Sequence, residues 1–376
     1  MKDATVSSFA ARKIHDAYSA AVNFISPPRV VEDRDELCPS VVSNGSIETV
    51  DYALENRFYD RESGEVDTIE SLPALSYMFE NVRVVGDQGY IYLPDGRLVA
   101  VCPEVCRIRR DKVRRPVPGM DRRIETPVFH LTGNNHESHG HFVIQHLPRL
   151  MAVRERLLRD RTAKLLLAPG HRGWQQFYLE KLGFEPDSLL EGTPGTLSID
   201  NLEYIPFFYG KENLVCSSMY RKMQQLFVAG KMIKKDRFIF LSRKGVAHRA
   251  LINEGDVFEE CRKIWPQLER VDLYDYNSQE QIELFQSARV VFGPHGQAFT
   301  NMIYSQGALA VIIRPDSEIK GWSTSFRNLA IQVGNEAVVL TAGVEGWRNK
   351  DNWVYSISRL KNQLSRLEAL LPPKYR

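Results

Sequence analysis

Histidines concentrate in one short stretch of the sequence. Five of the nine histidines of the chain lie between residues 130 and 146. An imidazole titrates near neutral pH and can remove a proton from a hydroxyl group, and a carboxylate can do the same. His141 is therefore a candidate general base that would activate an acceptor hydroxyl, with His139 and Glu137 as second choices.

The same stretch allows two other interpretations. His139 and His141, together with His136 or His146, could bind zinc, although the helical His-Glu-x-x-His pattern is absent. Alternatively, the histidines only satisfy backbone groups and fill polar space near a helix start. We expect one or two of them to face substrate and the others to have structural roles, and we expect no metal site.

Charged and polar side chains gather after the apolar run at residues 238–241. They are Ser242, Arg243, Lys244, Arg249, Asn253 and Glu254. Arginine and lysine can donate charge-assisted hydrogen bonds to a diphosphate without the help of a metal ion. An exposed basic turn would have the same composition, so this segment alone does not decide between the two.

A second segment suited to an anion begins at Gly293-Pro294-His295-Gly296, where an apolar run turns into a helix start. Free backbone amides and the helix dipole favour an anion there. The candidate binding residues are His295, Gly296, Gln297, Thr300 and Asn301. His295 could be merely a core histidine, but its position after Gly-Pro at a strand end favours a role in the site. The glycine fingerprint of dinucleotide enzymes and the Walker loop are both absent from the sequence, which disfavours dehydrogenases and P-loop kinases.

Strands and helices alternate in the C-terminal half. Apolar runs predict strands at residues 238–241, 270–273, 290–292 and 309–313. Helical spacing predicts helices at 256–265 and 279–288, the second opened by a capping box of Ser278 and Gln281. This alternation is typical of a parallel sheet, whose ligands bind beyond the carboxyl ends of the strands. We predict a Rossmann-like nucleotide-binding domain.

The N-terminal half is less regular. The sequence predicts an irregular lead-in at residues 1–80, a β-meander at 82–101 and an exposed basic loop at 107–123. Helices from 147 and at 174–182 alternate with strands at 164–168 and 202–205, and an amphipathic C-terminal helix should pack on the body of the protein. We divide the chain into an N-terminal acceptor-side domain at 1–220, a nucleotide-binding domain at 221–350 and the helix at 351–376.

The composition of the chain disfavours some classes of binding partner. The chain has 49 basic and 47 acidic side chains and a net charge of +2, so no global field would attract nucleic acid or an anionic membrane. The sequence predicts no transmembrane helix and no signal peptide. Five scattered cysteines fit a reducing compartment. We expect a cytoplasmic protein that binds no nucleic acid and has no membrane anchor, with peripheral membrane association left open.

Several of these segments resemble one enzyme family. The stretch His141–Leu150, then Ser242-Arg243 with Arg249 and Asn253-Glu254, then Gly293–Asn301 resemble glycosyltransferase family 61 in order and spacing. This family contains capsular-polysaccharide-type bacterial enzymes and eukaryotic xylosyl-, arabinosyl- and N-acetylglucosaminyltransferases. The resemblance covers roughly residues 85–340. It implies an α/β fold of GT-B type, in which two Rossmann-like domains face a central cleft.

The resemblance also implies an activity. Family members of this architecture transfer a hexosyl or pentosyl group, with inversion, from a UDP-sugar to a glycan, polysaccharide or lipid-linked glycan, without a metal or other cofactor. Arg243 and Arg249 would bind the diphosphate, and His295–Asn301 would form the donor loop. Gln145 stands where the family often has an acidic residue. An inactive nucleotide- or glycan-binding protein of the same fold, or a zinc-dependent hydrolase that uses residues 136–146, remains an alternative.

Overall fold

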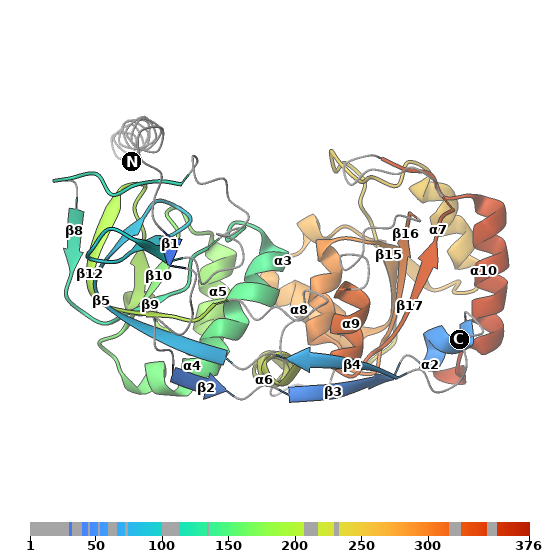
Figure 1. Cartoon of the computed structure of the whole chain (residues 1–376). Helices are drawn as coiled ribbons and strands as arrows, with labels where there is room; N and C mark the ends of the chain where they lie inside the picture. Colours follow the sequence, from blue (N-terminus) through green and yellow to red (C-terminus); the bar gives the residue numbers. More distant parts are fainter. Residues whose placement is uncertain are drawn as a thin grey trace. The chain divides into compact units, whose positions relative to one another are not determined.

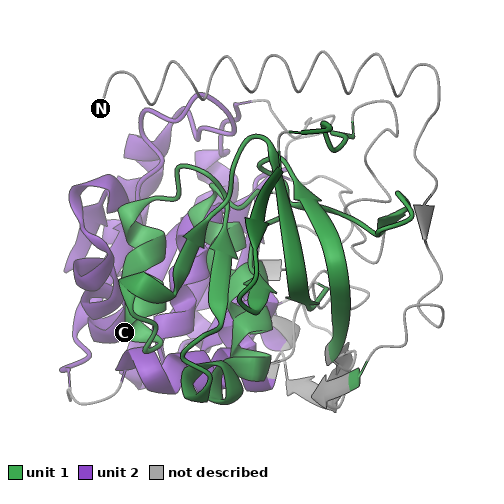
Figure 2. Ribbon diagram, turned by 90° about the vertical axis from the view of Figure 1, so that its left-hand side faces the viewer, with its two compact units in different colours: residues 1–45, 72–208 green, residues 46–71, 209–376 purple. Residues whose placement is uncertain are grey.

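The computed structural model describes residues 30–31, 40–43, 46–51, 53–58, 66–71, 74–99, 113–119, 121–133, 135–206, 217–228, 233–315, 325–343 and 352–376. The chain forms two compact units, and each is described by itself (Figure 2). Unit 1 comprises Met1–Gly45 and Leu72–Phe208, and unit 2 comprises Ser46–Ser71 and Tyr209–Arg376. The chain therefore leaves unit 1 at residue 46 and returns to it at residue 72.

A five-stranded parallel sheet forms the centre of unit 2. Its strands are β13 (Arg237–Leu241), β14 (Leu268–Val271), β15 (Ala288–Pro294), β16 (Leu309–Arg314) and β17 (Glu336–Thr341). Each neighbouring pair in the order β14-β13-β15-β16-β17 is parallel. The predicted parallel sheet is thus confirmed, although β14 begins at Leu268 rather than at Arg270. The prediction lacks β17.

The strand order changes direction between β13 and β15. From β13 the chain passes to β14 on one side and then to β15 on the other. In an open parallel sheet such a switch point creates a crevice beyond the carboxyl ends of the strands, where ligands bind. Arg243 lies just beyond the end of β13, and Gly296 lies just beyond the end of β15. Both predicted anion-binding segments therefore lie at this switch point.

Helices pack on the sheet of unit 2 (Figure 1). They are α6 (Ser217–Val228), α7 (Glu254–Arg262), α8 (Ser278–Ser287), α9 (Ser325–Gln332) and α10 (Ile357–Leu370), with the short 3-10 helices η6 (Leu273–Asp275), η7 (Gln297–Tyr304) and η8 (Pro373–Tyr375). Helix α10 buries Leu360, Leu364 and Leu367 and packs on α7. The indole Nε1 of Trp265 donates a hydrogen bond to the backbone oxygen of Tyr375 at 2.7 Å. The prediction of an amphipathic C-terminal helix that packs on the body is confirmed.

The capping box of α8 lies one residue earlier than predicted. Asn277 is the N-cap, and its Oδ1 accepts a hydrogen bond from the backbone nitrogen of Glu280 at 3.0 Å. The carboxylate of Glu280 accepts in return from the backbone nitrogen of Asn277 at 2.8 Å. Asn with Glu satisfies two backbone donors, and the acidic side chain also suits the positive end of the helix dipole. Ser278 is consequently the first residue of the helix.

Residues 46–71 belong to unit 2 and add a hairpin and a helix to it. Strand β3 (Ser46–Asp51) pairs with β4 (Val66–Ser71), and α2 (Ala53–Phe58) packs on β17 and α10. Two further strands from the expected irregular lead-in, β1 (Val30–Val31) and β2 (Ser40–Ser43), join the sheet of unit 1. Valine, isoleucine and threonine in these segments favour extended backbone. The expectation of an irregular lead-in therefore does not apply to these residues.

Unit 1 is built on a mixed sheet. Its other strands are β5 (Ala74–Val85), β6 (Tyr90–Tyr92), β7 (Leu98–Val99), β8 (Asp121–Ile124), β9 (Val128–His130), β10 (Lys164–Leu167), β11 (Leu189–Glu191) and β12 (Thr196–Tyr204). Strands β9, β10 and β11 are parallel, whereas β5 is antiparallel to both β6 and β12. Tight turns after β5 and β6 account for the antiparallel pairing of β5 with β6 and of β6 with β7. The expected Rossmann-like sheet is therefore present only as the parallel part of a mixed sheet.

The helices of unit 1 follow the parallel strands. After β9 come α3 (His139–His141), the π-helical turn η4 (Phe142–His146) and α4 (Leu147–Arg159); after β10 come α5 (Gly173–Lys181) and the 3-10 turn η5 (Pro186–Ser188). Strand β8 occupies the end of the expected basic loop, of which residues 107–112 and residue 120 lie outside the described residues. Within the described part of the chain, no helix has the length and apolar character needed to cross a membrane.

Arg149 fixes the carboxyl ends of two strands of unit 1. Its guanidinium is fully buried and donates hydrogen bonds to the backbone oxygens of His130 at 2.7 Å, Thr132 at 3.2 Å and Ile205. The same group lies over the ring of Tyr204, 5.1 Å from its centroid. A buried guanidinium is tolerated only where such partners replace its water. Arg149 therefore positions the loop that leads from β9 into the histidine-rich stretch.

His130 ties β9 to a turn of the meander. Its Nε2 donates a hydrogen bond to the backbone oxygen of Gly89 at 2.8 Å. Gly89 has a φ of 69°, and a Cβ at this position would lie 2.5 Å from the same Nε2, so glycine is required for two reasons. Burial, together with the positive charge of Arg149, lowers the pKa of His130 to about 3. The ring is therefore neutral at physiological pH.

We expect His130 to make unit 1 sensitive to acid. The pKa of His130 lies below its ordinary value of 6.5, so protons bind preferentially to the unfolded chain and stability falls as the pH drops below 6.5. At pH 5 the loss from this one group is about 2 kcal/mol. His130→Gln keeps a side-chain donor but cannot titrate. Urea unfolding at pH 7.5 and pH 5 should show a pH-dependent loss that is smaller in this variant by about that amount.

A matched control for this experiment is His248→Gln, which replaces an exposed histidine of unit 2. This variant should lose as much stability between the two pH values as the wild-type protein. An equal loss in the His130 variant and the wild type would show that His130 is not the source of the acid sensitivity.

Candidate active site

Arg243 crosses from the end of β13 to the end of β15. A Cβ at Gly296 would overlap Nη1 of Arg243, so the guanidinium packs directly on the backbone of residue 296. The φ of Gly296 is 175°, an extended conformation open to any residue. The close approach of Arg243, and not the backbone conformation, therefore requires glycine here. The structure thus brings together the two segments that the sequence marked separately.

Glu254 organises the turn that carries Arg243. Its carboxylate is only 4% exposed and lies in the first turn of α7. One oxygen accepts hydrogen bonds from Oγ of Ser242 at 2.7 Å and from the guanidinium of Arg270, and the other accepts from the backbone nitrogen of Arg243 at 2.7 Å. With both oxygens engaged, Glu254 holds the turn and is not exposed to a ligand.

The cations of this site repel one another. Burial lowers the pKa of Arg243, and the charge of Arg249 lowers it further, while Tyr274 and Glu254 act in the opposite direction. Arg249 also has a φ of 59°, a left-handed conformation that is uncommon for a residue with a side chain. Strain and like charges of this kind persist where function requires them, and an anionic ligand would relieve the repulsion.

Three buried polar atoms in these segments have no hydrogen-bond partner: Nε of Arg243, Oγ1 of Thr300 and Oδ1 of Asn301. Thr300 and Asn301 lie in η7, which begins directly after Gly296. Buried polar atoms are rarely left unpaired in folded proteins. A donor nitrogen beside a helix start, with two acceptor-capable oxygens in that helix, suits a ligand that carries both phosphate oxygens and hydroxyl groups.

The other residues predicted for this site have different surroundings. Asn253 pairs its side-chain amide with the backbone of Tyr355, as donor to the oxygen and as acceptor from the nitrogen, both at 2.9 Å. The ring of His295 packs against Phe326 at a centroid distance of 5.0 Å. Lys244 and Gln297 are exposed. Asn253 therefore anchors the C-terminal segment, and the two exposed residues are accessible to a ligand.

The candidate base His141 is held by Gln145. Nδ1 of His141 lies 2.8 Å from Oε1 of Gln145, four residues further along the chain. Because an amide oxygen only accepts hydrogen bonds, Nδ1 carries the proton and Nε2 is the basic nitrogen. The two residues lie in α3 and in the π-helical turn η4, an irregularity that is frequent at functional sites. Gln145, which cannot itself accept a proton at neutral pH, can set the tautomer of His141.

The second and third choices for the base differ sharply in their environment. Nε2 of His139 lies 2.9 Å from the hydroxyl of Tyr178, and the ring meets that of Trp174 edge-on at 5.4 Å. Burial lowers the pKa of His139 to about 4, so this ring is a weak base. Glu137 is exposed. The geometry thus favours His141 over His139 as a base.

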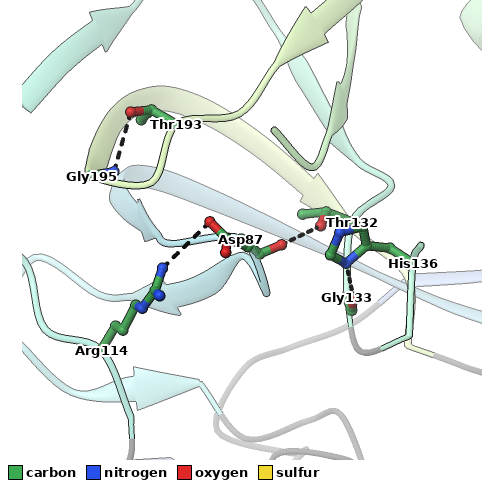
Figure 3. A network of polar contacts seen from close by, with 7 residues as sticks. All are labelled: Asp87, Arg114, Thr132, Gly133, His136, Thr193 and Gly195. Atoms are coloured by element: carbon green, nitrogen blue, oxygen red, sulfur yellow. Dashed lines mark hydrogen bonds and ion pairs between the residues drawn. The ribbon is translucent and has the colours of Figure 1, made fainter. Parts of the chain in front are cut away.

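A polar network fixes the backbone that leads into this stretch (Figure 3). The carboxylate of Asp87 pairs with Arg114 at 3.4 Å, and its backbone oxygen accepts from Oγ1 of Thr132 at 3.0 Å. Nδ1 of His136 bonds to the backbone oxygen of Gly133 at 2.9 Å. The two remaining residues of the network, Thr193 and Gly195, bond to each other at 3.1 Å in the loop before β12. His136 therefore stabilises its own turn.

The histidines do not converge as metal ligands would. Nδ1 of His146 bonds to the backbone oxygen of Leu131 at 3.0 Å, and the rings of His136, His139 and His141 each bond to a different partner. Among the residues that the structure describes, no three His, Cys, Asp or Glu side chains are grouped so as to hold a metal ion. The arrangement of these rings therefore favours proton transfer and structural roles over zinc ligation.

Sequence reasoning missed the residues that hold the site in place. In the sequence, Arg270 falls in a predicted strand, and Gln145 is visible only as a departure from the family pattern. Gln281 accepts from Nδ2 of Asn301 at 3.0 Å and so links α8 to η7. Only Arg270 had a signal in the sequence: it lies near the carboxyl end of a predicted strand, and the carboxyl ends of parallel strands face the ligand crevice.

Comparison with models of known protein families gives a match. The family model described as glycosyltransferase 61 matches residues 139–312, a range that includes His141, Arg243 and Gly296. No curated protein matches the chain significantly. The match supports the resemblance drawn from the three sequence motifs: residues 139–312 are similar to glycosyltransferase family 61.

Proposed function

We propose that the chain is an inverting glycosyltransferase that transfers a sugar from a UDP-sugar to a hydroxyl group of a glycan acceptor without a metal ion. The observation that carries this proposal is the packing of Arg243 on Gly296 at the switch point of a parallel sheet. A GT-B architecture, a cytoplasmic location and a role in polysaccharide assembly, such as capsule formation, belong to the same proposal.

The donor side supplies charge compensation. In a single displacement, the acceptor oxygen bonds to the anomeric carbon while the bond from that carbon to the diphosphate oxygen breaks. Negative charge then grows on the departing diphosphate, and Arg243, Arg249 and the backbone amides at the start of η7 stabilise it. Groups that are already oriented contribute most, because they need not reorganise during the reaction. Glu254 provides this orientation through its bonds to the turn.

The acceptor side supplies the base. The acceptor hydroxyl loses its proton as the new bond forms, and Nε2 of His141 takes this proton in our proposal. The bond from Nδ1 to Gln145 supports this role because it presents the basic nitrogen on the opposite side of the ring. The family's usual acidic residue at position 145 would give the ring a charged partner, whereas Gln145 gives it a neutral one.

The donor site predicts a loss of nucleotide affinity. Arg243→Ala should weaken UDP binding about 10- to 150-fold, because a hydrogen bond to a charged group contributes about 1.5–3 kcal/mol. Isothermal titration calorimetry with UDP in EDTA, followed by added Mn²⁺, measures this loss and the metal dependence together. The control Arg262→Ala removes an exposed arginine of α7 whose partner is Glu259 and should bind UDP as the wild type does. Unchanged UDP affinity in Arg243→Ala would refute the placement of the donor.

The base assignment predicts a loss of turnover without a loss of donor binding. His141→Ala should reduce kcat by a factor of roughly 10²–10⁴, the usual contribution of a general base, while UDP affinity stays at the wild-type level. The control His136→Ala removes a ring that bonds to the backbone of Gly133 and should retain most of the activity. Full turnover by His141→Ala with a competent donor and acceptor would exclude His141 as the base.

A further inference from the structure

Tyr274 is presented to solvent beside the candidate donor site. Among the described residues it is the most exposed large hydrophobic side chain, at 90%. It lies in η6, directly after the carboxyl end of β14. An aromatic ring so fully in water gains nothing from the hydrophobic effect in the folded chain alone. The exposed ring is therefore available for contact with another molecule.

The backbone that carries Tyr274 is held by side chains on both sides. Oδ1 of Asp272 accepts a hydrogen bond from the backbone nitrogen of Tyr274 at 3.0 Å. Nε2 of Gln281 donates to the backbone oxygens of Leu273 and Tyr276, both at 3.0 Å. The turn is thus fixed at three backbone atoms. A ring on such a turn can bind a flat partner with little loss of conformational entropy.

The turn is also linked to the diphosphate side of the site. Strand β14 is the direct neighbour of β13, and the backbone nitrogen of Ser242 bonds to the oxygen of Val271 at 2.8 Å, where both strands end. The hydroxyl of Tyr274 acts to raise the pKa of Arg243, so the two side chains lie within electrostatic range of each other. Beyond the carboxyl ends, the sheet therefore presents Tyr274, Arg243 and Gly296 in the order of their strands.

We propose that Tyr274 is the platform on which the base of the donor nucleotide stacks. A nucleotide-sugar has a diphosphate at its centre, with the nucleoside on one side and the sugar on the other. With the diphosphate on Arg243 and Gly296, a nucleoside that extends over β14 brings its base to Tyr274, and the sugar then extends towards β16. Any nucleobase can stack on an aromatic ring, so Tyr274 would contribute affinity but no selectivity between bases. Other groups must supply selectivity for uracil.

This inference rests on the proposed donor site, and it predicts a selective loss. Tyr274→Ala should weaken the binding of UDP about 5- to 150-fold, the effect expected when one stacked base loses its platform. Inorganic pyrophosphate has no base, so its affinity should not change. Tyr274→Phe keeps the ring and should bind UDP almost as the wild type does. Titration calorimetry of both probes in EDTA measures all of these affinities.

Two comparisons separate the possible outcomes. Val354→Ala shortens another exposed apolar side chain of unit 2 and should leave the affinities for UDP and pyrophosphate unchanged. If wild-type protein binds UDP and Arg243→Ala weakens it while Tyr274→Ala does not, the platform is refuted and the donor site stands. If wild-type protein binds neither probe, the donor site is refuted, and the platform with it. Equal weakening of UDP and pyrophosphate by Tyr274→Ala would also overturn the stacking role.

Discussion

The buried carboxylate of Glu254 is the constraint on which the proposed donor site depends. Removing a carboxylate from water costs several kcal/mol, and only a close counter-charge together with full hydrogen bonding offsets this cost. Arg270 supplies the charge, and Ser242 with the backbone nitrogen of Arg243 supplies the remaining bonds. One side chain thereby connects α7, β14 and the turn after β13. The same carboxylate thus fixes the backbone of Arg243, whose guanidinium packs on Gly296.

The sequence could predict the parallel sheet of unit 2 because its signals are local and repeated. Strands buried on both faces are short apolar runs, and helices of regular spacing separate them, so a parallel sheet follows from general rules. The carboxyl ends of parallel strands share one edge, which is why Arg243 and Gly296 could be expected together. The functions of Asn253 and Glu254 could not be predicted in the same way. Two neighbouring polar residues look alike in a sequence, but one bonds to Tyr355 and the other to the site turn.

In unit 1 the sequence indicates candidate residues but cannot rank them. A cluster of histidines indicates chemistry but does not rank its members, because burial and partners decide which ring can exchange a proton. Burial lowers the pKa values of His130 and His139, whereas the Nδ1 of His141 faces a neutral amide. The joining of residues 46–71 to unit 2 was equally hidden. A hairpin can be inferred from its own residues, but the sheet or helix against which it packs depends on contacts distant in sequence.

Preorganisation explains why the proposed donor site retains features that cost stability. Arg243 is desolvated, lies within the field of Arg249 and has an unpaired buried Nε, while Arg249 adopts a left-handed backbone conformation. Each feature is unfavourable in the protein alone, and a dianionic ligand reverses the electrostatic part by replacing repulsion with attraction. Gln281 contributes to this preorganisation. Its side-chain oxygen accepts a hydrogen bond from Asn301 in η7, and its side-chain nitrogen donates to the backbone of the turn that carries Tyr274. One amide thus sets the positions of both the helix that would receive the phosphate and the ring that would receive the base, so the two subsites cannot move independently.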